Sequence, residues 1–406
     1  MTDYVLPPAI RAEAEFAPSS GIVEVFNYGR DREGIIPLWA GEGDLPTPAF
    51  IREAAARSLE AGETYYTAQR GLPELRQAIA AYTDNLYGGN WDPNRFSVTS
   101  SGMHALLMSL RLISGAGNEV IVPTPAWPNF IGAMTTLGAT PIEVPMLYGQ
   151  AGWNFDLDAI ARAITPHTRA IVINSPSNPT GFTASYDELE GVLALARKHK
   201  LWILADEIYG RFVHDERLTV GNNRAPSVRD VMREDDDVLF IQSFSKNWAM
   251  TGWRVGWIEA PPRIAPVIEN LVQYSTSGVP VFVQRGALAA ITSGDAFIEE
   301  QVARSRQGRQ IICDGLAMTG LVDLVPPPGA FYAYFRVDGV SDSRQLALDL
   351  IDEAAVGLAP GTAFGRGGEE FLRLCFAKSP EMVGEAADRL ATAINRRGGA
   401  VRSALA

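Results

Sequence analysis

The stretch SFSKNWAMTGWRVGW, residues 243–257, places a lysine among serines, aromatic residues and glycines. Lysine is rare in this chain, because only four of the 35 basic residues are lysines and the other 31 are arginines. Lys198 and Lys200 lie in the polar segment ARKHK, where solvated lysines are expected. Lys246 has no such surroundings. Since arginine would supply the same charge, a lysine at this position points to the reactivity of its amine.

Short apolar segments alternate with segments of helical spacing around Lys246. This alternation predicts an α/β fold in which a mainly parallel sheet is covered by helices on both faces. After residue 285 the pattern changes to helices, a strand-like FYAYFRV (331–337) and further helices, which predicts a smaller α+β domain. The expected strands of the sheet are 119–123, 140–145, 169–176, 201–207, 237–245 and 254–260, and the expected helices are 50–62, 73–87, 127–138 and 186–200.

The composition excludes several classes of protein. The 406 residues are 47% hydrophobic and 20% charged, which is typical of a globular chain of two domains. The net charge of −12 argues against nucleic acid and anionic membrane as partners, since both require basic patches. No run of about 18 apolar residues could span a membrane, and residues 1–16 lack the pattern of a secretory signal. We therefore expect a cytoplasmic protein.

Cysteine and histidine are too few and too scattered for a metal site. Cys313 and Cys375 are the two cysteines, which cannot form a disulfide scaffold or a cysteine-based zinc site. The four histidines show no metal-ligand spacing. The sequence therefore predicts no metal.

Polar segments follow three of the predicted strands, at 174–180, 206–209 and 243–246. Ligands of open α/β sheets bind at the carboxyl ends of strands, so we expect these segments to meet at one site. Asp206 follows a five-residue apolar run and should be buried, and a buried carboxylate needs a cationic or hydrogen-bonded partner. The alternatives are a helix N-terminus, an ion pair and the protonated ring nitrogen of a cofactor.

Three further motifs have both a structural and a functional interpretation. TSSGMHAL (99–106) opens an apolar helix, whose first N–H groups are either simply capped or bind a phosphate. Asn178, in the turn SPSNPTG, either shapes a loop or directs its amide at a ligand oxygen. Trp127, in PAWPNF, either fills the core or stacks on a flat aromatic ligand.

A lysine amine can form a Schiff base with an aldehyde, which arginine cannot. Pyridoxal phosphate requires such a lysine, an acid facing its pyridine nitrogen and a cradle for its phosphate. Lys246, Asp206 and the backbone amides of 101–103 meet these requirements. Additional phosphate contacts are available from the residues that flank the lysine, namely Ser243, Ser245 and Arg254.

In this order the motifs resemble those of the class I/II pyridoxal-phosphate-dependent aminotransferases of fold type I, the family of aspartate aminotransferase. The resemblance extends over nearly the whole chain and rests on AGEGDLPTP (40–48), YTAQRGLPELR (66–76), SPSNPTG (175–181), ADEIY (205–209), residues 243–257 and FLRLCFA (371–377). It implies a large domain with a mainly parallel seven-stranded sheet between helices, and a smaller α+β domain. The expected division is an N-terminal segment and lid at 1–48, a large cofactor-binding domain at 49–288 and a small domain at 289–406.

The resemblance also implies how the cofactor is held. Lys246 is expected to bind it covalently and to move a proton at the substrate α-carbon. Asp206 would keep the pyridine nitrogen protonated, while Asn178 and Tyr209 donate hydrogen bonds to the phenolic oxygen. The remaining expected contacts are the stacking ring of Trp127 and the phosphate neighbours Ser101, Gly102, Met103, Ser243, Ser245 and Arg254.

For the substrate, the resemblance implies that Arg373 binds the α-carboxylate as a bidentate pair, near Asn178 and the backbone of Gly41. Tyr66 is similar to the tyrosine that reaches the phosphate of the neighbouring subunit, which implies a homodimer with shared active sites. The segment 19–31 resembles a mobile helix that closes over the substrate.

The implied reaction is ping-pong transamination, in which an L-amino acid gives its amino group to the cofactor and a 2-oxo acid, expected to be 2-oxoglutarate, receives it. One alternative is a C–S β-lyase on the same scaffold. Another is a ligand-sensing regulator with an aminotransferase-like domain, but such proteins carry an added DNA-binding domain, which we do not expect here. A nicotinamide-dependent dehydrogenase would need a GxGxxG between the first strand and helix, and the sequence shows none in that context.

The identity of the amino donor is less well specified. Met103 and His104 stand where some aspartate-using relatives carry a lysine, which argues against strict aspartate specificity. An apolar pocket suited to aromatic or aliphatic donors is expected from Ile22, Trp39 and Tyr65. Two further arginines, expected at the surface or at an interface, are Arg70 and Arg285.

Overall fold

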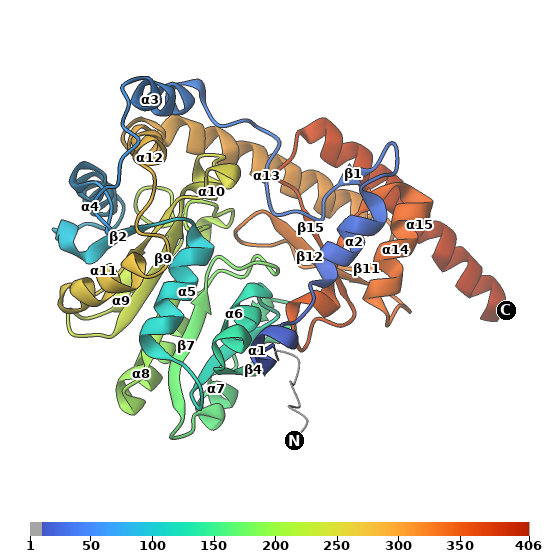
Figure 1. The fold of residues 1–406 in the computed structure, drawn as a ribbon. Coiled ribbons are helices and arrows are strands. Elements are labelled where there is room, and N and C mark those ends of the chain that lie inside the picture. The colour runs from blue at the N-terminus through green and yellow to red at the C-terminus, as the bar shows by residue number, and fades with distance from the viewer. Residues whose placement is uncertain (1–9, 406) are drawn as a thin grey trace, which may run out of the picture.

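The structure is a computed structural model that describes residues 10–405. Residues 1–9 and 406 lie outside the described residues. They are the outermost residues of the predicted divisions 1–48 and 289–406. Residues 1–9 also make up most of the segment 1–16, which is predicted not to be a secretory signal. Figure 1 shows a larger part built around a central sheet and a second part, formed by the C-terminal residues, against which the N-terminal segment packs.

The larger part is organised by a seven-stranded sheet with the strand order β2-β10-β9-β8-β7-β3-β4. The strands from β9 to β4 pair in parallel, and β10 runs antiparallel to both of its neighbours. The predicted α/β class with a mainly parallel sheet is therefore confirmed. The strands are β2 (Phe96–Thr99), β3 (Glu119–Thr124), β4 (Thr140–Pro145), β7 (Thr168–Asn174), β8 (Trp202–Asp206), β9 (Val238–Ser243) and β10 (Gly256–Glu259).

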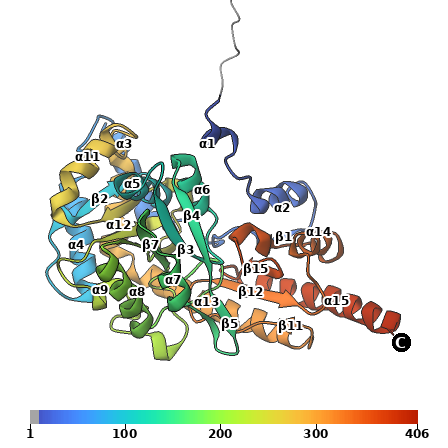
Figure 2. The same ribbon diagram turned by 90° about the horizontal axis from the view of Figure 1, so that it is seen from below.

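Successive side chains of the central strands enter two different cores, which explains why these strands are apolar throughout. In β7, Val172 packs into the core of one face, whereas Ile171 and Ile173 pack into the core of the other. Figure 2 shows the two groups of covering helices on opposite sides of the strands. The first group is α5 (Gly102–Ile113), α6 (Asn129–Leu137) and α11 (Ala265–Gln273), and the second is α7 (Leu157–Ala163), α8 (Tyr186–His199) and α9 (Val228–Val231).

A third core lies beside β2 and β10, where Val98 and Trp257 are buried against three further helices. These helices are α3 (Ala49–Glu60), α4 (Pro73–Tyr87) and α12 (Val281–Ser293). Pro73 begins α4, as the sequence predicts, because a proline at the first helical position gives up no hydrogen bond.

The C-terminal part contains a four-stranded sheet of β11 (Val322–Asp323), β12 (Tyr332–Val337), β15 (Phe371–Cys375) and β14 (Ala359–Pro360), with α13 (Asp295–Ala317), α14 (Ser343–Ala354) and α15 (Pro380–Leu405). β12 is the strand predicted at 331–337. The N-terminal segment joins this part, because β1 (Ile36–Pro37) pairs with β13 (Val356–Gly357) and α2 (Gly21–Gly29) packs on α14. The boundaries at 48 and 288 stay predictions. Further short elements are α1 (Ala12–Glu15), α10 (Phe244–Asn247) and the hairpin of β5 (Leu147–Gly149) and β6 (Gly152–Asn154).

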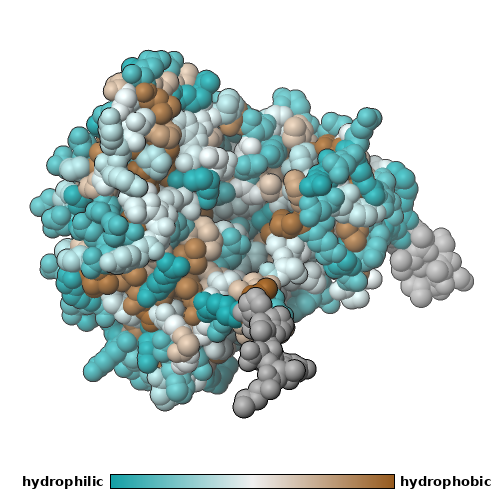
Figure 3. Space-filling model, in the orientation of Figure 1, coloured by the Kyte–Doolittle hydropathy of each residue, from teal (hydrophilic) through white to brown (hydrophobic). Residues whose placement is uncertain are grey.

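The surface on the side of Figure 1 is mostly hydrophilic, and its hydrophobic residues form small separate groups (Figure 3). Over the described residues, no helix combines the length and the apolar character needed to cross a membrane. Within residues 10–405 there is also no group of histidine, cysteine and acidic side chains that could hold a metal ion.

Candidate active site

A pocket of about 390 Å³ lies where β7, β8 and β9 end, between the central sheet and the C-terminal part. This is the place at which the sequence predicts ligand binding. All predicted site residues except Ser101 and Tyr66 line it. They are Gly41, Gly102, Met103, Trp127, Asn178, Asp206, Tyr209, Ser243, Ser245, Lys246, Arg254 and Arg373.

Lys246 lies on the short helix α10 (Phe244–Asn247), which directly follows β9. Its ammonium group donates a hydrogen bond of 2.5 Å to the carbonyl oxygen of Gly41. Desolvation lowers the pKa of Lys246 to about 8, because the charged form loses water that one carbonyl replaces only in part. Near neutral pH the amine is therefore a much better nucleophile and base than a solvated lysine.

Asp206 is the last residue of β8 and is only 2% exposed. One of its carboxylate oxygens accepts the backbone N–H of Ile208 at 3.3 Å. Burial raises the pKa of Asp206 to about 7, and the neighbouring negative charge of Glu207 contributes to the increase. A cation in the pocket would favour the ionised carboxylate, so Asp206 is suited to face a protonated ring nitrogen.

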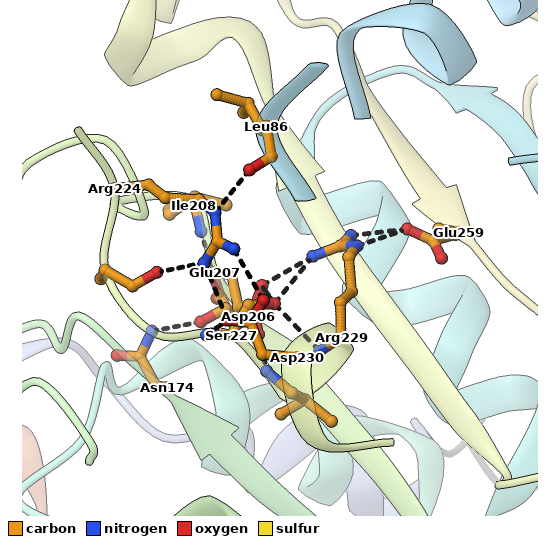
Figure 4. A network of polar contacts seen from close by, with 12 residues as sticks. Leu86, Asn174, Asp206, Glu207, Ile208, Arg224, Ser227, Arg229, Asp230 and Glu259 are labelled. Atoms are coloured by element: carbon orange, nitrogen blue, oxygen red, sulfur yellow. Dashed lines mark hydrogen bonds and ion pairs between the residues drawn. The ribbon is translucent and has the colours of Figure 1, made fainter. Parts of the chain in front are cut away.

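Glu207, the next residue, belongs to a buried ionic network behind the pocket (Figure 4). Its carboxylate accepts hydrogen bonds of 2.7 Å from both Ser227 and Arg229. Arg229 also donates to Glu259 of β10 at 2.6 Å. The network therefore holds the backbone at the end of β8, next to Asp206, through contacts of Glu207 with both Ser227 and Arg229.

The N-terminus of α5 opens into the pocket at Gly102 and Met103. Ser101 precedes it, and its hydroxyl accepts the backbone N–H of His104 at 2.9 Å. The Ser101 hydroxyl oxygen thus caps this helix, and its contact with a phosphate stays a prediction. Free N–H groups at a helix N-terminus favour bound anions.

Two serines and an arginine complete this end of the pocket. A methyl group at Gly102 would lie 3.2 Å from the β-carbon of Ser243, so the helix start and the end of β9 are in close contact. The Ser243 hydroxyl donates to the Ser245 hydroxyl at 2.9 Å, and Arg254 lines the same pocket. Hydroxyl groups and a guanidinium beside a helix N-terminus form a suitable phosphate cradle.

Arg373 lies at the centre of β15 and is 2% exposed. One of its terminal nitrogens donates to the side-chain oxygen of Asn178 at 3.2 Å, and the other donates to the carbonyl oxygen of Trp39. Its Nε is buried without a hydrogen-bond partner among the described residues. Since a buried donor of this kind needs an acceptor, a carboxylate entering the pocket would be a fitting ligand.

Tyr209 lies in the turn that follows Asp206, and its hydroxyl lies 2.6 Å from that of Tyr332. Tyr332 comes from β12 in the C-terminal part, and no local motif marks it as a site residue. Asn174 and Ile208 lie within segments that the sequence predicts to be at the site. The sequence predicts no role for the other lining residues, Ala40, Asn129, Ile241 and Thr251.

Tyr66 lies outside this pocket and is 95% exposed. With its neighbour Tyr65 it lines a separate surface cavity of about 430 Å³, together with residues 276–282. Tyr65 therefore does not belong to the apolar pocket of its own chain, contrary to expectation, whereas Ile22 and Trp39 do line that pocket.

Neither of the two additional arginines lines the main pocket. Arg70 donates to the hydroxyl of Ser97 at 3.0 Å, and Arg285 forms an ion pair of 2.9 Å with Glu63. Both arginines have partners within the chain and are half-buried.

The residues of the pocket meet the chemical requirements of pyridoxal phosphate. They provide an amine of lowered pKa, a buried acid and a helix N-terminus beside an arginine. Residues 33–390 match the family described as aminotransferase class I and II. The chain belongs to this family. As a class I and II aminotransferase it has fold type I and uses pyridoxal phosphate.

Several relatives are similar over nearly their whole length. The chain is 34% identical to aspartate aminotransferase of Thermotoga maritima, over 90% of this chain and 93% of that one. It is 32% identical to aromatic-amino-acid aminotransferase 2 of Thermococcus litoralis, over 94% and 97%. The solved structure of alanine aminotransferase from Pyrococcus furiosus has a TM-score of 0.88 at 25% identity, over 96% and 100%. The names of these relatives refer to different amino acids. Membership of the family therefore indicates the type of reaction, and the amino donor has to be inferred from the residues of the pocket.

Proposed function

We propose that this aminotransferase takes its amino group from an L-amino acid with an uncharged aromatic or aliphatic side chain. The observation that carries this proposal is the set of charges in the pocket. Among the described residues that line it, the cations are Lys246, Arg254 and Arg373. We assign Lys246 to the cofactor, Arg254 to its phosphate and Arg373 to the substrate α-carboxylate, so the described lining residues offer no further cation to an acidic side chain.

The proposed side-chain end of the pocket is apolar. Ile22 from α2 and Trp39 after β1 line it, and Met103 and Trp127 line it from the sheet side. Asn129 contributes an amide, which donates to the Met103 sulfur at 3.4 Å. Burial of an aromatic or branched side chain against such a surface is favourable by roughly 25 cal/mol per Å² of apolar area.

Bound pyridoxal phosphate supplies an electron-withdrawing ring that stabilises negative charge at the substrate α-carbon. Asp206 would hold a proton on the ring nitrogen, and Trp127 would lie against the ring. Asn178 and Tyr209 would donate hydrogen bonds to the phenolic oxygen. The phosphate would be held by the backbone of 101–103 and by Ser243, Ser245 and Arg254.

Lys246 is the proposed base for the α-carbon proton. Its Nζ is held by the carbonyl oxygen of Gly41, and its lowered pKa leaves a substantial neutral fraction near neutral pH. Arg373 would fix the α-carboxylate, and this orientation brings the α-carbon proton to the amine at a small entropic cost.

The proposed acceptor is 2-oxoglutarate, which rests on the family resemblance. Its second carboxylate finds no free cation among the described residues of this pocket. The second carboxylate of 2-oxoglutarate is one methylene farther from the α-carbon than that of aspartate, so it would extend past the apolar end of this pocket, toward solvent or a second subunit of the predicted homodimer.

A comparison of amino donors tests this proposal. We expect kcat/KM for phenylalanine or leucine to exceed that for aspartate by at least about tenfold, because a buried polar group without a partner costs about 1–3 kcal/mol and a charged one costs more. Met103→Lys should raise kcat/KM for aspartate, while the matched uncharged variant Met103→Leu should not. Preference of the unmodified protein for aspartate would contradict the proposal.

We also propose that the active unit is a homodimer in which Tyr66 reaches the partner's pocket. The support is the exposure of Tyr65 and Tyr66. Both side chains lie beside residues 276–282, and neither is buried within its own chain. Sedimentation should show a dimer, and Tyr66→Ala should release the cofactor faster than Tyr65→Ala. A monomer with full activity would contradict this assembly.

A further inference from the structure

Tyr332 lies among the proposed functional groups of the pocket. It is the first residue of β12, it is fully buried in the fold, and it still lines the pocket. Its hydroxyl is 2.6 Å from that of Tyr209, and its ring lies 4.8 Å from the guanidinium carbon of Arg373. A methyl group at Gly41 would overlap the Tyr332 hydroxyl. The Tyr332 side chain thus contacts both Tyr209, which is assigned to the cofactor, and Arg373, which is assigned to the substrate carboxylate.

The two tyrosine hydroxyls have one proton each, and only one of these protons is needed for the bond between them. Burial raises the pKa of both Tyr209 and Tyr332, so both stay protonated over the ordinary pH range. If Tyr332 donates to Tyr209, the proton of Tyr209 remains for an acceptor in the pocket. If Tyr209 donated to Tyr332, the proton of Tyr209 would be used in that bond, and Tyr209 could not donate to the phenolic oxygen of the cofactor.

The ring of Tyr332 has a separate contact. Arg373 is buried, and its guanidinium lies near the face of this ring and of Phe364, at 4.8 and 5.1 Å from the ring centroids. A buried guanidinium beside aromatic rings is stabilised by cation–π attraction. The ring therefore fixes where Arg373 offers its donors to a carboxylate.

We propose that Tyr332 is a positioning residue for transamination, whose hydroxyl directs the proton of Tyr209 toward the cofactor and whose ring supports Arg373. The proposal rests on the proposed roles of Tyr209 and Arg373. The two parts of the side chain act on different groups, so they can be separated by substitution.

Tyr332→Phe removes the hydroxyl and keeps the ring. Tyr209 then becomes a weaker donor, because it no longer accepts a polarising hydrogen bond. With pyridoxal phosphate bound, Tyr209 would give its phenolic oxygen a weaker hydrogen bond, so the nearby nitrogen of Lys246 would keep its proton to higher pH. We expect the pH midpoint of the visible cofactor band to rise by about half a unit, and kcat to fall about fivefold with little change in KM, as for the loss of about 1 kcal/mol.

Tyr332→Leu removes both parts. In addition to the shifted midpoint, KM for the amino acid should rise about tenfold, since Arg373 loses a ring contact. Tyr334→Phe is the matched control, because Tyr334 is also a fully buried tyrosine of β12, with its hydroxyl bonded to the Gly368 carbonyl outside the pocket. This control should keep the midpoint, kcat and KM of the unmodified enzyme.

The experiment is a pH titration of the cofactor band, with steady-state kinetics and thermal unfolding, on the three variants and the unmodified holoenzyme. A Tyr332→Phe enzyme with unchanged midpoint and kcat would overturn the role of the hydroxyl. An unchanged KM in Tyr332→Leu would overturn the role of the ring, and Tyr332→Phe remains decisive if the leucine variant does not fold. Failure of the proposed donor would be recognised separately, because the unmodified protein would then prefer aspartate, whereas the pH midpoint of the cofactor band reports on Tyr332 with any donor.

Discussion

The ammonium of Lys246 and the carbonyl oxygen of Gly41 are joined by a hydrogen bond, although 205 positions separate the two residues in the sequence. Lys246 follows the central sheet, whereas Gly41 follows β1, which pairs with β13 of the C-terminal part. The reactive amine is therefore placed by contacts between two regions of the fold. The same enclosure lowers the pKa of Lys246 to about 8.

Attachment of pyridoxal phosphate to the cofactor-free protein should become faster as the pH rises toward about 8 and level off above it, since the neutral amine is the nucleophile. Stopped-flow absorbance at a fixed cofactor concentration measures this rate. Glu42→Gln should move the midpoint to lower pH, because the Glu42 carboxylate raises the pKa of Lys246. A midpoint near 10.5, the usual pKa of lysine, would contradict the desolvation of this amine.

Asp206 should make the stability of the cofactor-free protein depend on pH. Its pKa is about 7 in the folded chain against 3.8 ordinarily, so between these values the folded protein holds a proton that the unfolded one has released. The free energy of unfolding then falls as the pH rises from about 4 to about 7, by up to about 1.4 kcal/mol per pH unit. Thermal unfolding at pH 5 and pH 8 should show this loss, and Asp206→Asn should show less of it. Parallel pH profiles of the two proteins would count against the buried, unpaired carboxyl.

Arg373→Lys should raise KM for the amino acid and for the 2-oxo acid together, because both substrates carry the α-carboxylate that Arg373 is proposed to bind. The expected increase is about 10- to 100-fold, corresponding to a lost charge-assisted hydrogen bond. Arg336→Lys is the control, since Arg336 lies on the neighbouring strand and is partly exposed, with Asp323 as its partner. If only one of the two substrates were affected, the proposed role of Arg373 would be wrong.

Arg229→Met should destabilise the protein by about 3–5 kcal/mol, because it leaves the carboxylates of Glu207 and Glu259 buried without their shared cation. Urea unfolding measures the change. The control Arg217→Met removes a highly exposed arginine from its ion pair with Asp215 and should change stability by less than about 1 kcal/mol. A similar decrease of the free energy of unfolding in the two variants would contradict a larger contribution of the buried network.

Much of the central sheet was predictable from sequence, because its strands bury both faces and are continuously apolar. Ile171, Val172 and Ile173 illustrate this, since each is buried although successive side chains enter different cores. The polar residues that end these strands, such as Asp206, were also predictable as site residues. The pocket contains them because parallel strands present their carboxyl ends at one edge.

Contacts between distant segments were not predictable from local patterns. β15 is a short strand in which Arg373 interrupts the run of apolar residues. The buried guanidinium of Arg373 needs its hydrogen bonds to Asn178 and to the Trp39 carbonyl, which come from two other regions of the chain. Tyr332 is one of several aromatic residues in its strand, and only the folded chain shows its contact with Tyr209. The capping role of the Ser101 side chain likewise emerged from the geometry of α5.

The most direct test of the account is a visible absorption scan of the purified holoenzyme and of Lys246→Ala, before and after the addition of one amino acid and then of a 2-oxo acid. We predict that the cofactor band of the unmodified enzyme disappears with phenylalanine or leucine and returns with 2-oxoglutarate, and that Lys246→Ala shows no such cycle. A cycle of normal rate in Lys246→Ala, or release of pyruvate and ammonia in place of the returning band, would contradict the central claim that Lys246 serves transamination in this pocket.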